Sequence, residues 1–486
     1  MTRDRLAGMN WKRVILLASG PMAAAVVFMI VPESMHRPDA EPLILGFPGR
    51  LTAAMTAWMA VWWVSEAVPI YITALLPMLL LPTSGVQSSA DIADFYGHRI
   101  VYFAVGGFLL AAAIEKWALH KRFAFAVIGM CGNCPRNLIA GFMLASALLS
   151  MWISNTATAI IMLPVAMSIV RLVDEENPHY NSFAVCLLLS ISYACSIGGM
   201  GTLIGTGTNM FFAAWVEGTL ERSIAFVDWM FIAVPIVIVL LPVAWLLMTR
   251  VIFRIPASAE TLQLDTTGLI DRQPWNTGQV LTLAIFVCAA LLWMFVPILR
   301  ELPGLQNLTD TAIAIAVGIL LFVIPADKSA SNTLMDWRTA AKKVPWGIVL
   351  LIGGGLCMAQ AVSKFGVGEL MAYQLETINI LPTAIVVLCV VALMVFLTEF
   401  SSNIASVTAL TPVFAAFALS RDMDPLGIVI PITIAASCAF MLPAATLTNS
   451  VIMGSGMIKG YEMARAGLLL NLVAIVIISL RFAWGV

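Results

Sequence analysis

Residues Ile153–Pro164 read ISNTATAIIMLP, and residues Ser401–Pro412 read SSNIASVTALTP. Both stretches are mainly apolar and uncharged, yet each contains a Ser-Asn pair. They lie in the apolar runs 137–170 and 380–420, each of which is too long for one membrane crossing of about 20 residues. Irregular backbone at membrane depth is tolerated only against protein or a watery cavity. We therefore predict that each run is a re-entrant hairpin, in which two half-length helices meet at a polar tip.

The overall composition points to a membrane as the solvent for most of the chain. Of the 486 residues, 61% are hydrophobic and 11% are charged, whereas soluble domains have about 25% charged residues. The formal net charge of −1 excludes the basic surface that nucleic-acid binding requires. The N-terminal segment lacks the cleavage site of a signal peptide, so we expect its first apolar run to be retained as a membrane helix.

Apolar segments of spanning length recur along the whole chain. They predict an all-α polytopic membrane protein with about 11 transmembrane helices and the two re-entrant hairpins. Lys and Arg are concentrated on one set of connecting segments, which predicts a plasma (inner) membrane protein with a cytoplasmic N-terminus and an outward C-terminus. The predicted spans are 14–31, 51–68, 70–84, 100–115, 183–200, 228–249, 279–297, 310–325, 346–363, 430–446 and 466–485.

One offset relates the two halves of the sequence. The segments GGFLLAAAIEKWAL and GGLCMAQAVSKFGV begin at Gly106 and Gly354, which are 248 positions apart. The same offset of 248 aligns Asn155 with Asn403, and it also aligns the two prolines that end the opening stretches. Chance could produce any one of these matches but hardly all of them, so we infer an internal repeat.

A third pair of matching segments follows the two hairpins. GTGTN occupies 205–209 and ATLTN occupies 445–449. Glycine and threonine interrupt otherwise apolar spans there, and we predict that each crossing helix is broken at that point. An odd number of predicted crossings separates the repeats, so the second is inverted relative to the first. Inverted repeats with broken helices near the bilayer midplane are typical of secondary transporters.

The tips and breaks together offer a site for an anion and for cations. Helix N-termini point backbone N–H groups and positive dipole ends toward an anion. Unwound backbone frees carbonyl oxygens, which form a neutral oxygen shell with Ser, Thr and Asn side chains and suit an alkali cation. No Arg or Lys lies in either hairpin cluster. An anion would therefore depend on the co-bound cations, because an unpaired charge is costly at that depth.

Other interpretations of these residues have to be weighed. Small polar residues also join helices to one another in membrane bundles, although their pairing by an inverted repeat favours a binding site. Glu399 precedes the second cluster and is either a proton or cation ligand or a structural partner of a lysine. The CGNC pair, Cys131 and Cys134, lacks the further ligands that zinc needs. An intramembrane enzyme would need an activated nucleophile, and the clusters place no His or Lys beside Ser154.

At these motifs the sequence resembles the divalent anion/sodium symporter family, the sodium-dependent dicarboxylate transporters. The family's Ser-Asn-Thr motifs match Ser154-Asn155-Thr156 and, in part, Ser402-Asn403-Ile404, and its helix-break motifs match GTGTN and ATLTN. WWVSEAVPIYITALLPMLLLP, from Trp62, is similar to another signature of the family. The resemblance extends from about residue 50 to the end of the chain.

The resemblance implies a homodimer in which each subunit has a fixed scaffold domain and a mobile transport domain that moves like an elevator. It implies one sodium (Na+) site at Ser150, Ser154, Asn155 and Gly205, and another at Thr398, Ser401, Asn403 and Ala445. The anion would meet Ser154, Asn155, Thr156, Ser402, Asn403, Thr206 and Thr446. The implied division is a cytoplasmic N-terminus (1–13), scaffold helices (14–99), a first repeat core (100–227), scaffold helices with cytoplasmic linkers (228–345), a second repeat core (346–465) and a C-terminal helix (466–486).

The expected function is sodium-coupled symport of a C4-dicarboxylate such as succinate, malate or fumarate into the cell, with no enzymatic activity. Ile404 stands where the family has a threonine, and both prolines of each TPPN motif are absent from the segments 205–209 and 445–449. These departures leave citrate or sulfate as alternative substrates. A sodium-independent exchanger, or a proton-coupled carrier in which Glu399 titrates, is the alternative mechanism.

Overall fold

The computed structural model describes residues 11–37, 40–130, 132, 134–258, 274–326, 332–375 and 382–483. Nearly all of the secondary structure in these segments is helical, as a membrane protein of this composition requires. The all-α prediction missed one small hairpin, in which β1 (Ser34–Arg37) pairs with β2 (Ala40–Ile44) in antiparallel fashion. Seven described helical segments are long and apolar enough to cross a membrane.

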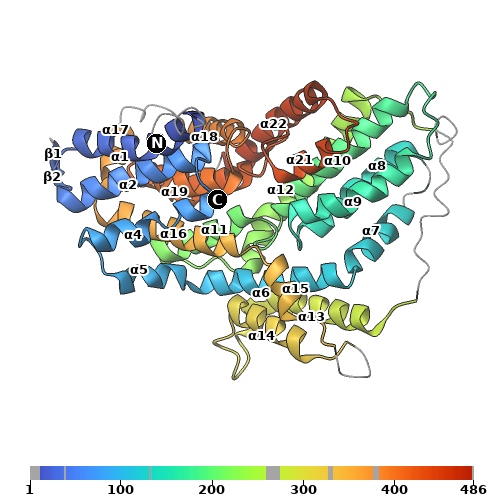
Figure 1. The fold of residues 1–486 in the computed structure, drawn as a ribbon, viewed down its shortest axis with the longest axis horizontal. Coiled ribbons are helices and arrows are strands. Elements are labelled where there is room, and N and C mark those ends of the chain that lie inside the picture. Colours follow the sequence, from blue (N-terminus) through green and yellow to red (C-terminus); the bar gives the residue numbers. More distant parts are fainter. Residues whose placement is uncertain are drawn as a thin grey trace, which may run out of the picture.

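The N-terminal helices form one end of the molecule (Figure 1). There α1 (Trp11–Ile30) packs along α2 (Gly46–Ser65). The predicted span 70–84 is instead divided into α3 (Ile70–Thr73) and α4 (Leu76–Thr83). The short helix α5 (Ser89–Tyr96) then leads into the long helix α6 (Arg99–Lys116).

Helices α7, α8, α9 and α10 of the first repeat lie toward the opposite end of the molecule, whereas α11 lies in its middle (Figure 1). The central element of this repeat is α10, in which every residue from Phe183 to Gly199 is buried, so this helix packs against protein on every side rather than against lipid. It packs against α8 and α9, the two arms of the first hairpin. The bounds are α7 (Leu119–Gly129), α8 (Pro135–Ser150), α9 (Asn155–Val170), α10 (Tyr180–Gly199) and α11 (Gly207–Leu220).

The segment between the repeats packs against both of them. Helix α12 contacts α8, α10 and α22, and α14 lies along α6, where a side chain at Gly106 would overlap the backbone of Ala314. The bounds are α12 (Phe226–Leu246), the π-helical segment η1 (Leu247–Ile252), α13 (Thr277–Leu299), α14 (Asp310–Val323) and α15 (Trp337–Lys343).

The second repeat follows the same order of elements as the first. Gly354 is the counterpart of Gly106, and its missing side chain likewise lets a backbone approach, here that of Ala74. The predicted span 430–446 is wrong as a single helix, because α20 ends at Ala435. The bounds are α16 (Trp346–Lys364), α17 (Val367–Leu375), α18 (Thr383–Leu397), α19 (Asn403–Leu419), α20 (Leu426–Ala435), α21 (Leu447–Met453) and α22 (Gly460–Phe482).

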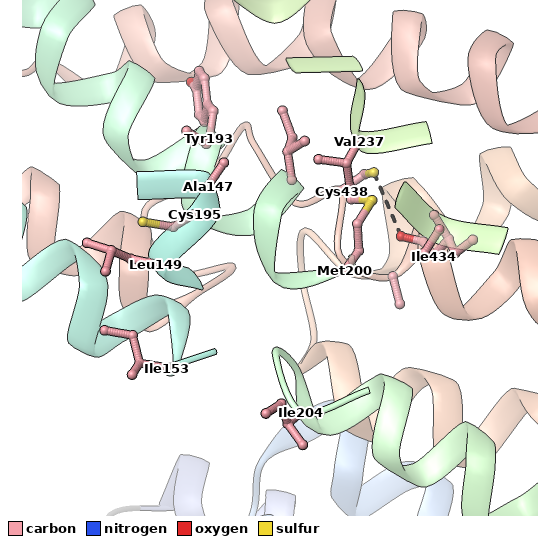
Figure 2. Packing of buried hydrophobic residues seen from close by; sticks show 14 of the residues in the cluster. Ala147, Leu149, Ile153, Tyr193, Cys195, Met200, Ile204, Val237, Ile434 and Cys438 are labelled. Atoms are coloured by element: carbon pink, nitrogen blue, oxygen red, sulfur yellow. Dashed lines mark hydrogen bonds between the residues drawn. The ribbon is translucent and has the colours of Figure 1, made fainter. Parts of the chain in front are cut away.

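The hydrophobic core joins the two repeats where their helices are interrupted. Figure 2 shows Met200, at the end of α10, beside Cys438, which follows the end of α20. Val237 of α12 lies next to both, and the rings of Tyr193 and Phe440 make an edge-to-face contact at 5.2 Å. The interrupted segments are therefore packed into protein, which is the setting that irregular backbone requires in a membrane.

Candidate functional site

The first hairpin turns between Ser150, the last residue of α8, and Asn155, the first residue of α9. Ser154 is the N-cap of α9, and its Oγ accepts a hydrogen bond from the backbone N–H of Ala157 at 3.3 Å. The Ser150 hydroxyl donates to the Asn155 Oδ1 at 2.5 Å. The tip therefore gathers hydroxyl, amide and backbone oxygens without any charged side chain.

The first helix break, residues 200–206, lies directly against this tip. Asn209 Nδ2 donates to the carbonyl oxygens of Met200 at 3.2 Å and Thr202 at 2.7 Å, which holds the unwound backbone in place. A side chain at Gly199 would overlap the Asn155 Oδ1, and one at Gly205 would overlap the Gly199 carbonyl. The break was expected at 205–209, but it comes earlier, because α11 already begins at residue 207.

The second hairpin repeats this arrangement. The Thr398 hydroxyl lies 2.5 Å from the Asn403 Oδ1 and 3.0 Å from the carbonyl oxygen of Ala436, the residue that caps α20. Thr398 corresponds to Ser150 at the offset of 248, so both asparagines meet a hydroxyl five residues earlier at the same distance. The Ser401 hydroxyl contacts the Ser406 hydroxyl at 2.6 Å rather than the asparagine.

The second break, residues 436–446, is held by the same device as the first. Asn449 Nδ2 donates to the carbonyl oxygens of Ala439 and Leu442, both at 3.0 Å. These acceptors lie ten and seven positions before the asparagine, as do two acceptors of Asn209, the carbonyls of Gly199 and Thr202. The GTGTN and ATLTN motifs thus end in asparagines that brace two unwound segments, a role that the motifs themselves do not reveal.

The two repeats also exchange contacts. Helix α9 of the first hairpin packs against α21, and α19 of the second hairpin packs against α11. Thr206 and Thr446 are the N-caps of α11 and α21, and each accepts a hydrogen bond from the N–H of the asparagine that ends its motif. Each hairpin tip therefore lies near the break of its own repeat, and each hairpin packs against the helix that follows the break of the other repeat, α21 or α11.

Most of the expected cation ligands are brought together. Ser150, Asn155 and Gly205 meet around Gly199, and Thr398 and Asn403 meet at the end of α20. The Ala445 N–H donates to the Leu442 carbonyl at 3.2 Å, and within the described residues no hydrogen bond links Ala445 to Thr398 or Asn403. The hydroxyls of Thr156 and Ser402 make no hydrogen bond in the described part of the chain, so both are available to a ligand.

Glu399 places a carboxylate at the second tip, and it is 2% exposed. Its oxygens accept hydrogen bonds from the N–H groups of three successive residues of the second break, Phe440, Met441 and Leu442, at 2.7, 2.9 and 3.0 Å. A fourth donor is the Asn471 side chain of α22, at 2.7 Å. The lysine partner considered from sequence is therefore wrong, and the carboxylate instead holds the unwound segment. An asparagine inside the apolar run 466–485 was the sequence signal for this contact.

The chain can now be placed among known proteins. Residues 11–486 match the family model described as the sodium:sulfate symporter transmembrane region. The chain belongs to this family. A sodium-dependent dicarboxylate transporter of Staphylococcus saprophyticus is 34% identical over 90% of this chain and 86% of its own length. A transporter of the same name from Staphylococcus aureus is 36% identical over the same shares of the two chains. The predicted resemblance is thereby confirmed, and the protein is a multi-pass membrane transporter rather than an enzyme.

Two solved structures share the fold of this symporter-family chain. The YdaH transporter of Alcanivorax borkumensis has a TM-score of 0.61 and is 12% identical, with 97% of each chain covered. MtrF of Neisseria gonorrhoeae, described as an antimetabolite efflux pump, has a TM-score of 0.63 and is 11% identical, with 97% of this chain and 94% of that chain covered. At such low identity the likeness concerns the fold alone, a mostly helical membrane transporter fold.

One of the two cysteines of the CGNC segment, Cys134, lies in the described part of the chain. The Cys134 Sγ donates to the carbonyl oxygen of Ala257 at 2.9 Å. Cys131 lies outside the described residues, so the interpretation that this pair lacks the ligands of a zinc site stays a prediction.

Proposed function

We propose that this chain is a sodium-coupled symporter that carries C4-dicarboxylates such as succinate, malate and fumarate into the cell. One observation carries the proposal: two uncharged oxygen clusters, Ser150 with Asn155 and Thr398 with Asn403, repeat the same geometry beside two unwound segments. Matching neutral clusters fit two cations of the same kind. The names of the curated relatives, sodium-dependent dicarboxylate transporters, support the choice of sodium and of a dicarboxylate.

In this proposal sodium is cargo, and the chain supplies its ligands from side-chain and backbone oxygens. The first site consists of Ser150, Ser154, Asn155 and Gly205, and the second of Thr398, Ser401, Asn403 and Ala445. At the second site the Ala436 carbonyl already lies 3.0 Å from the Thr398 hydroxyl, so a backbone oxygen is in position to join the ligands. Unwound backbone of this kind coordinates sodium in secondary transporters.

The anion would lie between the two hairpin tips. Its partners would be Ser154, Asn155, Thr156, Ser402, Asn403, Thr206 and Thr446. Both α9 and α19 begin at a Ser-Asn pair, so their N–H groups and positive dipole ends face the tips. In this arrangement the positive charge that balances a dianion comes from sodium, and loss of the cations removes the anion as well. That dependence couples the two fluxes.

The proposed motion is an elevator movement of a transport domain that includes both re-entrant hairpins. The scaffold would comprise the helices of 14–99 and 228–345, and two copies of the chain would form a homodimer. The N-terminus would lie in the cytoplasm and the C-terminus outside. Citrate or sulfate is the second candidate cargo, because Ile404 removes a hydroxyl from one side of the site and the family description names sulfate.

Uptake by purified protein in sealed vesicles tests the proposal. Labelled succinate should accumulate when sodium is higher outside than inside, and replacement of sodium by choline should abolish accumulation. A proton gradient imposed without sodium should drive no uptake. Equal uptake with and without sodium would refute symport, and accumulation of labelled sulfate or citrate in place of succinate would refute the proposed substrate class.

A further inference from the structure

Gly207 and Ile404 touch across the boundary between the two repeats. Gly207 is the first residue of α11, and Ile404 is the second residue of α19. A side chain added at Gly207 would overlap the Cδ1 of Ile404 and lie 3.2 Å from its Cγ1, with Ile348 at 3.6 Å. The isoleucine side chain therefore occupies the space that the glycine leaves open, and the two residues form a matched pair.

This pair makes the two halves of the site chemically unequal. Thr156 takes the position of Ile404 in the first hairpin, and its hydroxyl is uncommitted among the described residues. At the second hairpin Ser402 caps α19 without a side-chain hydrogen bond, whereas Ser154 accepts one from Ala157. Each tip thus keeps one free hydroxyl, but the second tip adds an apolar, half-buried surface at Ile404.

We infer that the Gly207–Ile404 pair selects dicarboxylates whose carbon chain carries no hydroxyl group. The inference rests on the proposed function and concerns the choice among its substrates. A carboxylate can bind the Ser402 hydroxyl and the N-terminus of α19, while the methylene or vinyl carbons lie against Ile404. A substrate hydroxyl at the same place loses its water and finds no donor or acceptor in return, which costs free energy. Succinate and fumarate are therefore preferred over malate and tartrate.

Competition against labelled succinate in sealed vesicles measures this preference directly. For the unmodified chain we expect unlabelled succinate and fumarate to inhibit uptake at concentrations about tenfold lower than malate or tartrate, because one buried polar group left without a hydrogen-bond partner weakens binding on that scale. Ile404→Thr should narrow that ratio severalfold, because the new hydroxyl mirrors Thr156. Ile404→Val is the matched control, since valine has the shape of threonine without the hydroxyl, and it should retain the ratio.

The contact itself is tested by a pair of substitutions. Gly207→Ala should weaken succinate uptake because the new methyl displaces Ile404, and the double variant Gly207→Ala with Ile404→Val should recover part of it. Equal inhibition by succinate and malate in the unmodified chain would overturn the inference alone, as would a ratio that Ile404→Thr leaves unchanged. Absence of any sodium-dependent succinate uptake in the unmodified chain would instead overturn the proposed function, and this inference with it.

Discussion

At the scale of single residues, the equivalence of the two tip asparagines could be predicted from the sequence, but their hydrogen-bond partners could not. The offset of 248 shows that Asn155 and Asn403 hold equivalent positions. Their contacts with Ser150 and Thr398 depend on how the backbone of each hairpin turns between its two helices, and residue spacing does not reveal that turn. The hydrogen bonds by which Asn209 and Asn449 hold the unwound segments could not be predicted for the same reason. Their acceptors are backbone carbonyls that are free only where the helix unwinds.

The first residue-scale prediction concerns the two tip asparagines. Asn155→Ala or Asn403→Ala should reduce sodium-dependent succinate uptake to background, because each removes the oxygen that faces the hydroxyl five residues earlier. The loss in folding stability should be modest, about 1 kcal/mol for one hydrogen bond. Uptake is measured in vesicles, and gel filtration in detergent checks assembly. Wild-type uptake and sodium dependence in both variants would show that the site lies elsewhere.

The second residue-scale prediction concerns Glu399. Glu399→Gln places an NH2 group among four hydrogen-bond donors, so at least one N–H of the second break loses its acceptor. We expect a loss of about 3 kcal/mol in stability, the scale for disrupting a buried charged network, seen as a lower thermal unfolding temperature in detergent. Asn471→Ala removes only one of the donors and should cost less. A Glu399→Gln variant as stable as the unmodified chain would contradict the bracing role.

At the scale of elements, hydropathy predicts where the long helices lie, but it does not predict where two of the apolar runs are interrupted. The run 70–84 is mostly apolar, yet its helix is interrupted at Ala74 and Leu75, because Pro77 has no N–H to donate to the Thr73 carbonyl. The Ala74 carbonyl accepts instead from the Tyr96 hydroxyl at 2.6 Å. The run 430–446 stops being helical at residue 436 because Glu399 and Asn449 bind its backbone groups. Hydropathy cannot anticipate such donors and acceptors, because they are tertiary contacts.

The element-scale prediction concerns the junction of α10 with the first hairpin. Gly199→Ala should lower the thermal unfolding temperature and the sodium affinity together, because its methyl would overlap the Asn155 Oδ1. Gly427→Ala is the matched control: this glycine lies in α20, and an added side chain there meets nothing within 4 Å. The control should be neutral or slightly stabilising, by at most about 1 kcal/mol. Equal behaviour of the two variants would mean that the close contact at Gly199 is unimportant.

At the scale of the whole molecule, charged contacts gather at the ends of the helices rather than along them. At the C-terminal end of α6, Lys116 binds Asp336 at 2.9 Å and Glu115 pairs with Lys343, which ties α6 to the α15 region. The Lys116 ammonium lowers the pKa of the Asp336 carboxyl, so this pair stays ionised through the neutral range. At the other end of α6, Arg99 pairs with Glu217 of α11. Positive residues at the first of these ends predict that it faces the cytoplasm.

That orientation can be tested with single exposed positions on either side of α14. Glu301 precedes this helix in the loop after α13, and Arg338 follows it in α15; both are exposed. We expect a membrane-impermeant maleimide to label Glu301→Cys in intact cells and Arg338→Cys only after permeabilisation, each above the signal of the unmodified chain with its native cysteines. The two positions differ by one crossing, so their labelling should be opposite. The reverse pattern would invert the proposed topology and place the N-terminus outside, and labelling of both in intact cells would remove α14 as a crossing.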